Sequence, residues 1–163
     1  MENKMLITKK LNDALNAQIG REMEASNQYL QIAAYFEGRY LKKLAELFFK
    51  QAAEEQEHAL KFLHYVNETN GKLVLPAIAA PKVDFASAEE AVALSLKWEQ
   101  DVTGYIYELM EIAESTKDYI AREFLAWFVT EQLEEVSSMD TLLGVIKNVG
   151  DKNLIMAEAY LSH

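Results

Sequence analysis

Four glutamates stand inside the apolar stripes of this 163-residue sequence, each near the middle of a long stretch with helical periodicity. They are Glu22, Glu55, Glu99 and Glu135. A histidine follows the second by three residues, in the pattern Glu55-x-x-His58, and a glutamine precedes the fourth, in the pattern Gln132-x-x-Glu135. Because positions i and i+3 share a helix face, the two side chains of each pattern point the same way.

This combination of side chains is suited to binding metal ions. Burying an ionised carboxylate costs several kcal/mol even after relaxation. The stripes carry no lysine or arginine at this level, whereas two divalent cations would balance four carboxylates. Carboxylate oxygens with one imidazole are ligands for iron, manganese or zinc. The pattern therefore predicts a paired metal site.

The positions of the four acids predict that they meet in one layer. Each lies about 12–17 residues into its segment, or about 20–25 Å from the helix start at 1.5 Å per residue. In helices about 45 Å long these are midpoints, which coincide whichever way the helices run. A single such glutamate would more often keep its carboxylate in water at the stripe's edge. Four coincident midpoints favour the buried layer.

The elements that must position these acids are long helices. Sustained 3–4 spacing of apolar residues predicts an all-α four-helix bundle with a short C-terminal fifth helix. The expected segments are 8–37, 40–70, 87–114, 118–149 and 151–161. Ser87 with Glu90 forms a capping-box signature, and Asp118 is expected to cap the fourth helix. Gly38 and Gly71 are expected to end helices in the left-handed conformation, and the fourth segment is expected to stop at Gly150.

The connection between the second and third segments is long for a helical bundle. It has about 16 residues and contains both prolines of the chain, Pro76 and Pro81. Fully extended it reaches roughly 50 Å, enough to run the length of a bundle about 45 Å long. We therefore expect the third helix to be parallel to the second. Residues 1–163 are expected to form a single domain.

Charge and composition exclude several classes of protein. The formal net charge is −10, which disfavours nucleic acid and anionic membrane surfaces as partners. The chain has no cysteine, so disulfides, thiolate metal sites and cysteine nucleophiles are absent. No signal peptide or membrane span is expected, which fits a cytoplasmic protein.

Four stretches resemble, in this order, non-haem ferritins of the bacterial and archaeal type: REMEASNQYLQIAAYF, QAAEEQEHALKFL, WEQ and FLAWFVTEQLEEV. The resemblance covers most of the chain and implies a ferritin-like bundle with a di-iron ferroxidase centre. It implies that Glu22, Glu55 and His58 hold the first iron. It also implies that Glu55 bridges to a second iron, held by Glu99 and Glu135, with Gln132 beside them.

The same resemblance implies roles for residues around the centre. Tyr29 matches the family tyrosine next to the centre, and Trp127 matches a nearby aromatic residue. Two roles are open for each of these aromatic residues: electron donation to the centre, or packing against neighbouring side chains. Glu54, Glu131 and Glu134 match a third iron site, and the alternative for them is a solvated acidic face.

The resemblance implies a function in iron storage and detoxification. Fe(II) would be oxidised by oxygen or hydrogen peroxide and stored as ferric mineral inside a homo-oligomeric shell of 24 subunits in the cytoplasm. Bacterioferritins have a haem-ligating methionine where this chain has Gln56, so no haem is expected.

Three rival functions can be weighed on the sequence. A DNA-protecting mini-ferritin usually carries a basic tail, and Lys4, Lys9 and Lys10 are few against a net charge of −10. A rubrerythrin-like peroxidase needs a second Glu-x-x-His and commonly a cysteine-rich domain, and this chain has neither. A non-catalytic bundle requires the four midpoint acids to be solvated.

Overall fold

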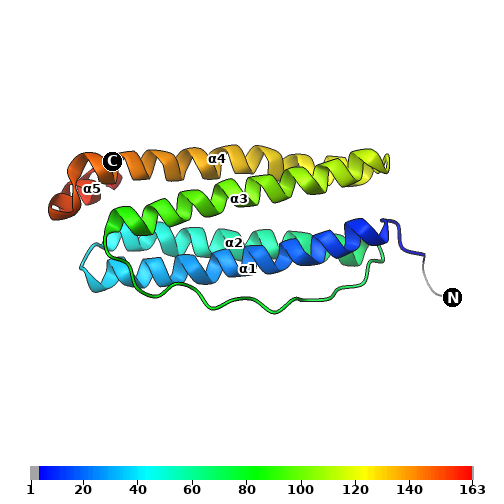
Figure 1. Ribbon diagram of the computed structural model, residues 1–163, viewed down its shortest axis with the longest axis horizontal. Helices are drawn as coiled ribbons and strands as arrows, with labels where there is room; N and C mark the ends of the chain where they lie inside the picture. Colours follow the sequence, from blue (N-terminus) through cyan, green and yellow to red (C-terminus); the bar gives the residue numbers. More distant parts are fainter. Residues whose placement is uncertain (1–3, 163) are drawn as a thin grey trace.

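Four long helices lie side by side along one axis in the computed structural model, which describes residues 4–162 (Figure 1). They are α1 (Lys9–Gly38), α2 (Lys42–Glu68), α3 (Ala88–Ser115) and α4 (Tyr119–Val149). A 3₁₀ turn, η1 (Asp151–Asn153), leads into the short α5 (Leu154–Leu161) at one end of the bundle. The described residues contain no β-strand, and the predicted all-α four-helix bundle with a fifth helix is confirmed.

Polar side chains cap the start of three helices, two of them, at Ser87 and Asp118, as expected. Thr8, Ser87 and Asp118 each accept a hydrogen bond from the backbone N–H three residues on, at 2.9–3.1 Å. Such caps satisfy amide groups that have no partner within the helix. The carboxylate of Glu90 does not complete a capping box with Ser87, because it accepts the N–H of Ala86 at 2.5 Å.

The left-handed residues after the first two helices are not the glycines that were expected. Gly38 is the last residue of α1, and the left-handed residue that follows is Tyr40, with φ of 61°. After α2 the left-handed residue is Asn70, with φ of 55°, rather than Gly71. Asparagine tolerates this conformation because its short side chain bonds locally. The fourth helix stops before Gly150 as expected, and this glycine has a φ of 74° and a ψ of 159°.

The crossover between α2 and α3 runs along the whole bundle, so α3 is parallel to α2 as expected (Figure 1). Two buried amides of α1 hold it in place. Asn16 donates to the carbonyl of Lys72 at 2.8 Å and accepts the N–H of Val74 at 2.9 Å. Gln28 donates to the carbonyl of Lys82 at 3.0 Å and accepts its N–H at 2.8 Å. Backbone groups of the crossover thereby gain partners.

The core consists of two apolar clusters separated by a polar layer. One cluster is near the α5 end and includes Phe36, Phe48 and Leu142. The other is near the N-terminal end of α1 and includes Phe62 and Phe128. On every long helix the expected acid falls between residues of one cluster and residues of the other. None of the helices within residues 4–162 is long and apolar enough to cross a membrane.

Candidate metal centre

The four midpoint acids are buried together in the layer between the two apolar clusters. Glu22, Glu55 and Glu99 are each 1% exposed, and Glu135 is 3% exposed. This matches the predicted layer and contradicts the alternative in which the acids are solvated on the stripe edges. In a bundle that binds no cation, the burial of four carboxyl groups would only lower the stability of the fold.

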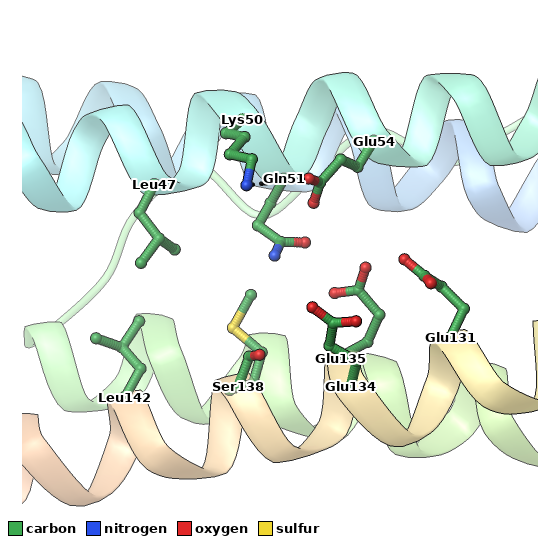
Figure 2. A pocket seen from close by; sticks show the side chains of 10 residues that line it. Leu47, Lys50, Gln51, Glu54, Glu131, Glu134, Glu135, Ser138 and Leu142 are labelled. Carbon is green, nitrogen blue, oxygen red and sulfur yellow. Dashed lines mark ion pairs between the residues drawn. The ribbon is translucent and has the colours of Figure 1, made fainter. Parts of the chain in front are cut away.

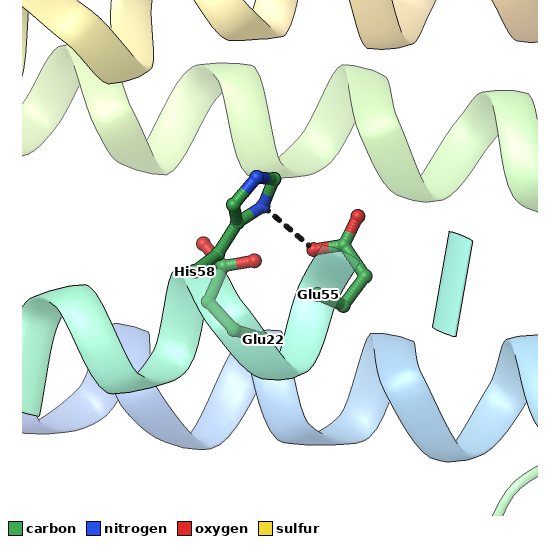
Figure 3. A group of neighbouring side chains, drawn as sticks. All are labelled: Glu22, Glu55 and His58. Carbon is green, nitrogen blue, oxygen red and sulfur yellow. Dashed lines mark hydrogen bonds and ion pairs between the residues drawn. The ribbon is translucent and has the colours of Figure 1, made fainter. Parts of the chain in front are cut away.

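The acids form two groups that could each hold a cation, and the groups share one residue. Glu22, Glu55 and His58 offer ligand atoms within 4.8 Å of one another (Figure 3). The second group has the same spacing and consists of Glu55, Glu99 and Glu135. Because Glu55 belongs to both, its carboxylate is placed to bridge two ions.

One buried oxygen in each of three carboxylates accepts no hydrogen bond from any residue between 4 and 162. These atoms are Glu22 Oε2, Glu55 Oε1 and Glu135 Oε2. A buried acceptor without a partner costs about 1–3 kcal/mol, and more if it is charged. A cation between the groups would satisfy all three atoms, so the residues present fit a pair of metal ions.

In the second group, neighbouring side chains hold both oxygens of Glu99. The Tyr29 hydroxyl donates to Oε1, and the Gln132 amide donates to Oε2 at 3.2 Å. The same amide also lies 3.2 Å from the Thr103 hydroxyl. The structure thus brings Tyr29 and Gln132 into the layer, where both orient Glu99.

In the first group, each carboxylate has one bonded oxygen and one free oxygen. Gln18 donates to Glu22 Oε1 at 2.7 Å, and His58 Nδ1 lies 3.2 Å from Glu55 Oε2. Sequence reasoning did not identify Gln18. The available signal was its position four residues before Glu22, which places both side chains on one helix face. Thr103, four residues after Glu99, carries the same signal.

Burial dominates the electrostatics of the layer. Loss of hydration, followed by the charge of neighbouring carboxylates, raises the pKa of Glu135 to about 8. Burial likewise raises the pKa of Glu99 to about 7 and the pKa values of Glu22 and Glu55 well above their usual range. The raised pKa values favour the protonated forms of these groups when no cation is present. A metal ion that binds here displaces those protons.

The expected third group of acids lines a pocket of about 210 Å³ between α2 and α4 (Figure 2). Glu54, Glu131 and Glu134 all lie on its wall, together with Glu135 of the buried layer. The pocket therefore adjoins the layer. Glu54 already pairs with a cation, because Lys50 Nζ lies 3.4 Å from its Oε1.

Within this pocket, the geometry associates Glu131 with the layer more closely than with the other wall acids. Glu131, His58 and Glu135 offer ligand atoms within 4.8 Å of one another. His58 Nε2 lies 3.9 Å from Glu131 Oε1, on the opposite side of the ring from Glu55. The imidazole thus stands between the buried layer and the pocket.

Trp127 lies at the edge of the layer and contacts a proposed ligand. Its ring centroid is 5.5 Å from that of His58, with the planes at 74°. Lys61 Nζ lies 3.1 Å from the Trp127 ring centroid. This contact is compatible with packing and with electron donation, so both roles of Trp127 stay open.

Comparisons with known proteins agree with this geometry. The sequence matches the ferritin-like domain family over residues 12–149. It is 38% identical to the bacterial non-heme ferritin of Staphylococcus aureus over 146 residues, which span 90% of this chain and 88% of that protein. The relative from Staphylococcus epidermidis gives the same values.

Solved structures show the same similarity. An open-pore ferritin from the archaeon Archaeoglobus fulgidus superposes with a TM-score of 0.92 at 32% identity, covering 98% of both chains. A closed form engineered from the Archaeoglobus fulgidus ferritin superposes with a TM-score of 0.90 at 33% identity, covering 96% of both chains.

Proposed function

We propose a function on one premise: the chain belongs to the ferritin-like domain family. The protein binds two Fe(II) ions in the buried layer, oxidises them to Fe(III), and stores the product as ferric mineral. Iron is thus both substrate and cargo, and the catalytic activity is that of a ferroxidase. The non-heme ferritins among its relatives support this assignment.

The observation that carries the proposal is the shared Glu55. It joins the Glu22–His58 group to the Glu99–Glu135 group, and its Oε1 is buried without a hydrogen-bond partner. A bridging carboxylate holds two ions close together, so one acceptor molecule can receive an electron from each. Hydrogen peroxide, for example, takes two electrons and two protons to give two molecules of water.

The surrounding side chains position the ligands for this reaction. Glu22 and His58 bind the first iron, Glu99 and Glu135 bind the second, and Gln132 and Tyr29 orient Glu99. The raised pKa values of Glu99 and Glu135 mean that both release a proton when iron binds. The iron ions supply the redox chemistry, and the protein supplies charge and geometry.

The acids of the pocket give the product a path out of the layer. Fe(III) moves past His58 and Glu131 toward Glu54 and Glu134, where carboxylates begin the ferric mineral. Glu131 belongs to a ligand group with His58 and Glu135 and also lines the pocket, which supports this route.

We propose that storage takes place in a cytoplasmic shell of 24 copies without haem. The neighbouring solved structures are ferritins, which supports a shell, and Gln56 stands where a haem-ligating methionine would be required. A net charge of −10 attracts cations to such a shell.

One experiment tests oxidation, storage and assembly together. Purified protein is fractionated by size, loaded with Fe(II) without oxygen, and then exposed to oxygen or hydrogen peroxide while ferric absorbance is followed. We expect rapid ferric absorbance in a fraction of roughly 450 kDa, 24 times the chain mass of 18.6 kDa. Oxidation no faster than in protein-free buffer would overturn the proposed activity. Rapid oxidation with ferric precipitate outside the protein fraction would overturn storage.

A further inference from the structure

Two side chains connect the buried Glu22 with the surface of α1. Gln18 is fully buried, and its amide Nε2 donates to Glu22 Oε1 at 2.7 Å. On its other side, Gln18 Oε1 accepts a hydrogen bond from Arg21 Nη1 at 3.2 Å. A cation at the surface is thus linked to a carboxylate in the layer through one amide.

The chemistry of the two partners fixes the orientation of that amide. A guanidinium group only donates hydrogen bonds, and the Glu22 carboxylate, once it has released its proton to bind a metal ion, only accepts them. Gln18 can therefore satisfy both only with its oxygen toward Arg21 and its nitrogen toward Glu22. Hydrogen bonds in such a chain polarise one another, so the Arg21 charge strengthens the bond that reaches Glu22.

Arg21 is held in place by an aromatic ring rather than by an acid. Its guanidinium carbon lies 3.6 Å from the centroid of Tyr105, an arrangement that favours a cation. Glu24 and Asp101 line the same surface pocket, but within residues 4–162 Arg21 forms no ion pair with a carboxylate. Its guanidinium group is therefore available to donate a hydrogen bond to Gln18.

We propose that Gln18 and Arg21 are positioning residues for the first metal position, turning Glu22 so that Oε2 faces the cation. Gln18 occupies Oε1, and Oε2 is the buried oxygen left without a partner. This inference rests on the proposed metal pair. It assigns the first ion a single Glu22 oxygen as ligand and leaves the second ion independent of Gln18.

The ligands of the second metal position are oriented by other side chains, so the inference predicts different effects at the two positions. Glu99 receives its hydrogen bonds from Tyr29 and Gln132, two neutral side chains within the layer. Within residues 4–162, neither Gln18 nor Arg21 forms a hydrogen bond with Glu99, Tyr29 or Gln132. Changes at Gln18 or Arg21 should therefore weaken one position and spare the other.

The test is a titration of the iron-free protein with Co(II), followed by calorimetry and by visible absorption, which responds to the ligands of each ion. In Gln18→Met we expect the affinity of one position to fall roughly 10–100-fold, the usual effect of losing a partner of a metal ligand. The other position should keep its affinity and its absorption band. Arg21→Met should show a smaller loss at the same position, and Arg21→Lys should restore part of it.

Gln28→Met is the matched control. Gln28 is also a buried glutamine of α1 with two hydrogen bonds, but both go to the backbone of Lys82 in the crossover. We expect it to lower the unfolding temperature without changing either Co(II) affinity. Equal Co(II) binding in Gln18→Met and Gln28→Met would overturn the inference, as would equal weakening of both positions in Gln18→Met.

Two further results would also be informative: failure of Gln18→Met to fold, and absence of Co(II) binding in the wild-type protein. If Gln18→Met does not fold, Arg21→Met carries the test, because Arg21 lies at the surface; unchanged Co(II) binding there would overturn the link from the surface to Glu22. If the wild-type protein binds no Co(II) in the layer, the proposed metal pair fails. If it binds two ions and neither variant differs, only the positioning role fails.

Discussion

The acids inside the bundle and the acids on the pocket wall have the same chemistry but different surroundings. Those of the layer are at most 3% exposed, and three of them keep an oxygen without any hydrogen-bond partner. The wall acids are reached by water: the side chains of Glu54 and Glu131 are 31% and 25% exposed. Glu54 also pairs with Lys50.

This difference shows that burial, rather than acidity, marks the site. A solvated carboxylate is stable without a cation, whereas a buried one must hold a proton or bind a counter-charge. The layer should therefore bind metal ions much more strongly than the pocket wall does. Substitutions in the layer should accordingly have much larger effects than substitutions on the wall.

The largest effect is expected from Glu55→Ala, because it removes the ligand common to both positions. We predict that rapid Fe(II) oxidation is abolished in stopped-flow measurements. The iron-free variant should remain folded, with an unfolding temperature equal to or above that of the wild type, because a buried acid has been removed. Glu54→Ala, one residue away on the pocket wall, is the control and should keep rapid oxidation. Unchanged rates in Glu55→Ala would refute the assignment of the layer.

The second prediction concerns pH and the removal of metal. A carboxyl group whose pKa is higher in the folded protein stabilises the fold at low pH, and that stabilisation is lost as pH rises toward the folded value. The metal-free protein should lose stability between about pH 4.5 and pH 8, the span from the usual glutamate pKa to the raised values of Glu99 and Glu135. For Glu99 alone the loss is on the order of 3 kcal/mol.

Denaturant unfolding at several pH values checks this prediction, with and without Zn(II). Metal ions should oppose the loss, because they bind the deprotonated carboxylates. Glu99→Gln should flatten the pH dependence of the metal-free protein. A metal-free protein that becomes more stable from pH 5 to pH 8 would contradict the raised pKa values.

A smaller effect is expected on the pocket wall, and it should be unequal among the acids. Glu131→Gln should slow repeated cycles of iron oxidation severalfold, because Glu131 lies with His58 and Glu135 on the proposed path. Glu134→Gln should slow them less, because Glu134 belongs to no such ligand group among the described residues. Multiple-turnover oxygen consumption measures both variants. Equal slowing would indicate a diffuse acidic face instead of a path.

The smallest effect is expected from Lys50→Met, which frees Glu54 from its ion pair. Exposed ion pairs contribute roughly 0–1 kcal/mol, so the affinity of the wall for a cation should rise at most about fivefold. Zn(II) titration of the protein with its two inner positions filled measures this change, and the gain should shrink at high salt. A rise well above tenfold would mean that the wall binds metal almost as strongly as the layer.

The sequence was sufficient to predict the layer because two independent patterns agreed, the periodicity of the apolar residues and the lengths of the helical segments. The stripe spacing placed Glu22 and Glu55 on inward faces, and the equal helix lengths placed them at one level. The caps Thr8, Ser87 and Asp118 lie within a residue or two of the expected starts because capping depends on local side chains. These features depend on near neighbours in the chain, which a sequence displays directly.

Other features depend on contacts that a single sequence does not display. The ends of α1 and α2 lie within two residues of the expected positions, but the left-handed residues that follow are Tyr40 and Asn70, which their local sequence does not single out. The link from Arg21 through Gln18 requires knowing that Tyr105 lies beside α1. The association of Glu131 with His58 depends on the packing of α2 against α4.

The central claim is that two metal ions share Glu55 in the buried layer, and anomalous diffraction at the iron absorption edge tests it most directly. Crystals loaded with Fe(II) without oxygen should show two peaks about 3.5–4 Å apart. One should contact Glu22 and His58, the other should contact Glu99 and Glu135, and Glu55 should lie between them. Iron found only among Glu54, Glu131 and Glu134, with the layer empty, would contradict the account.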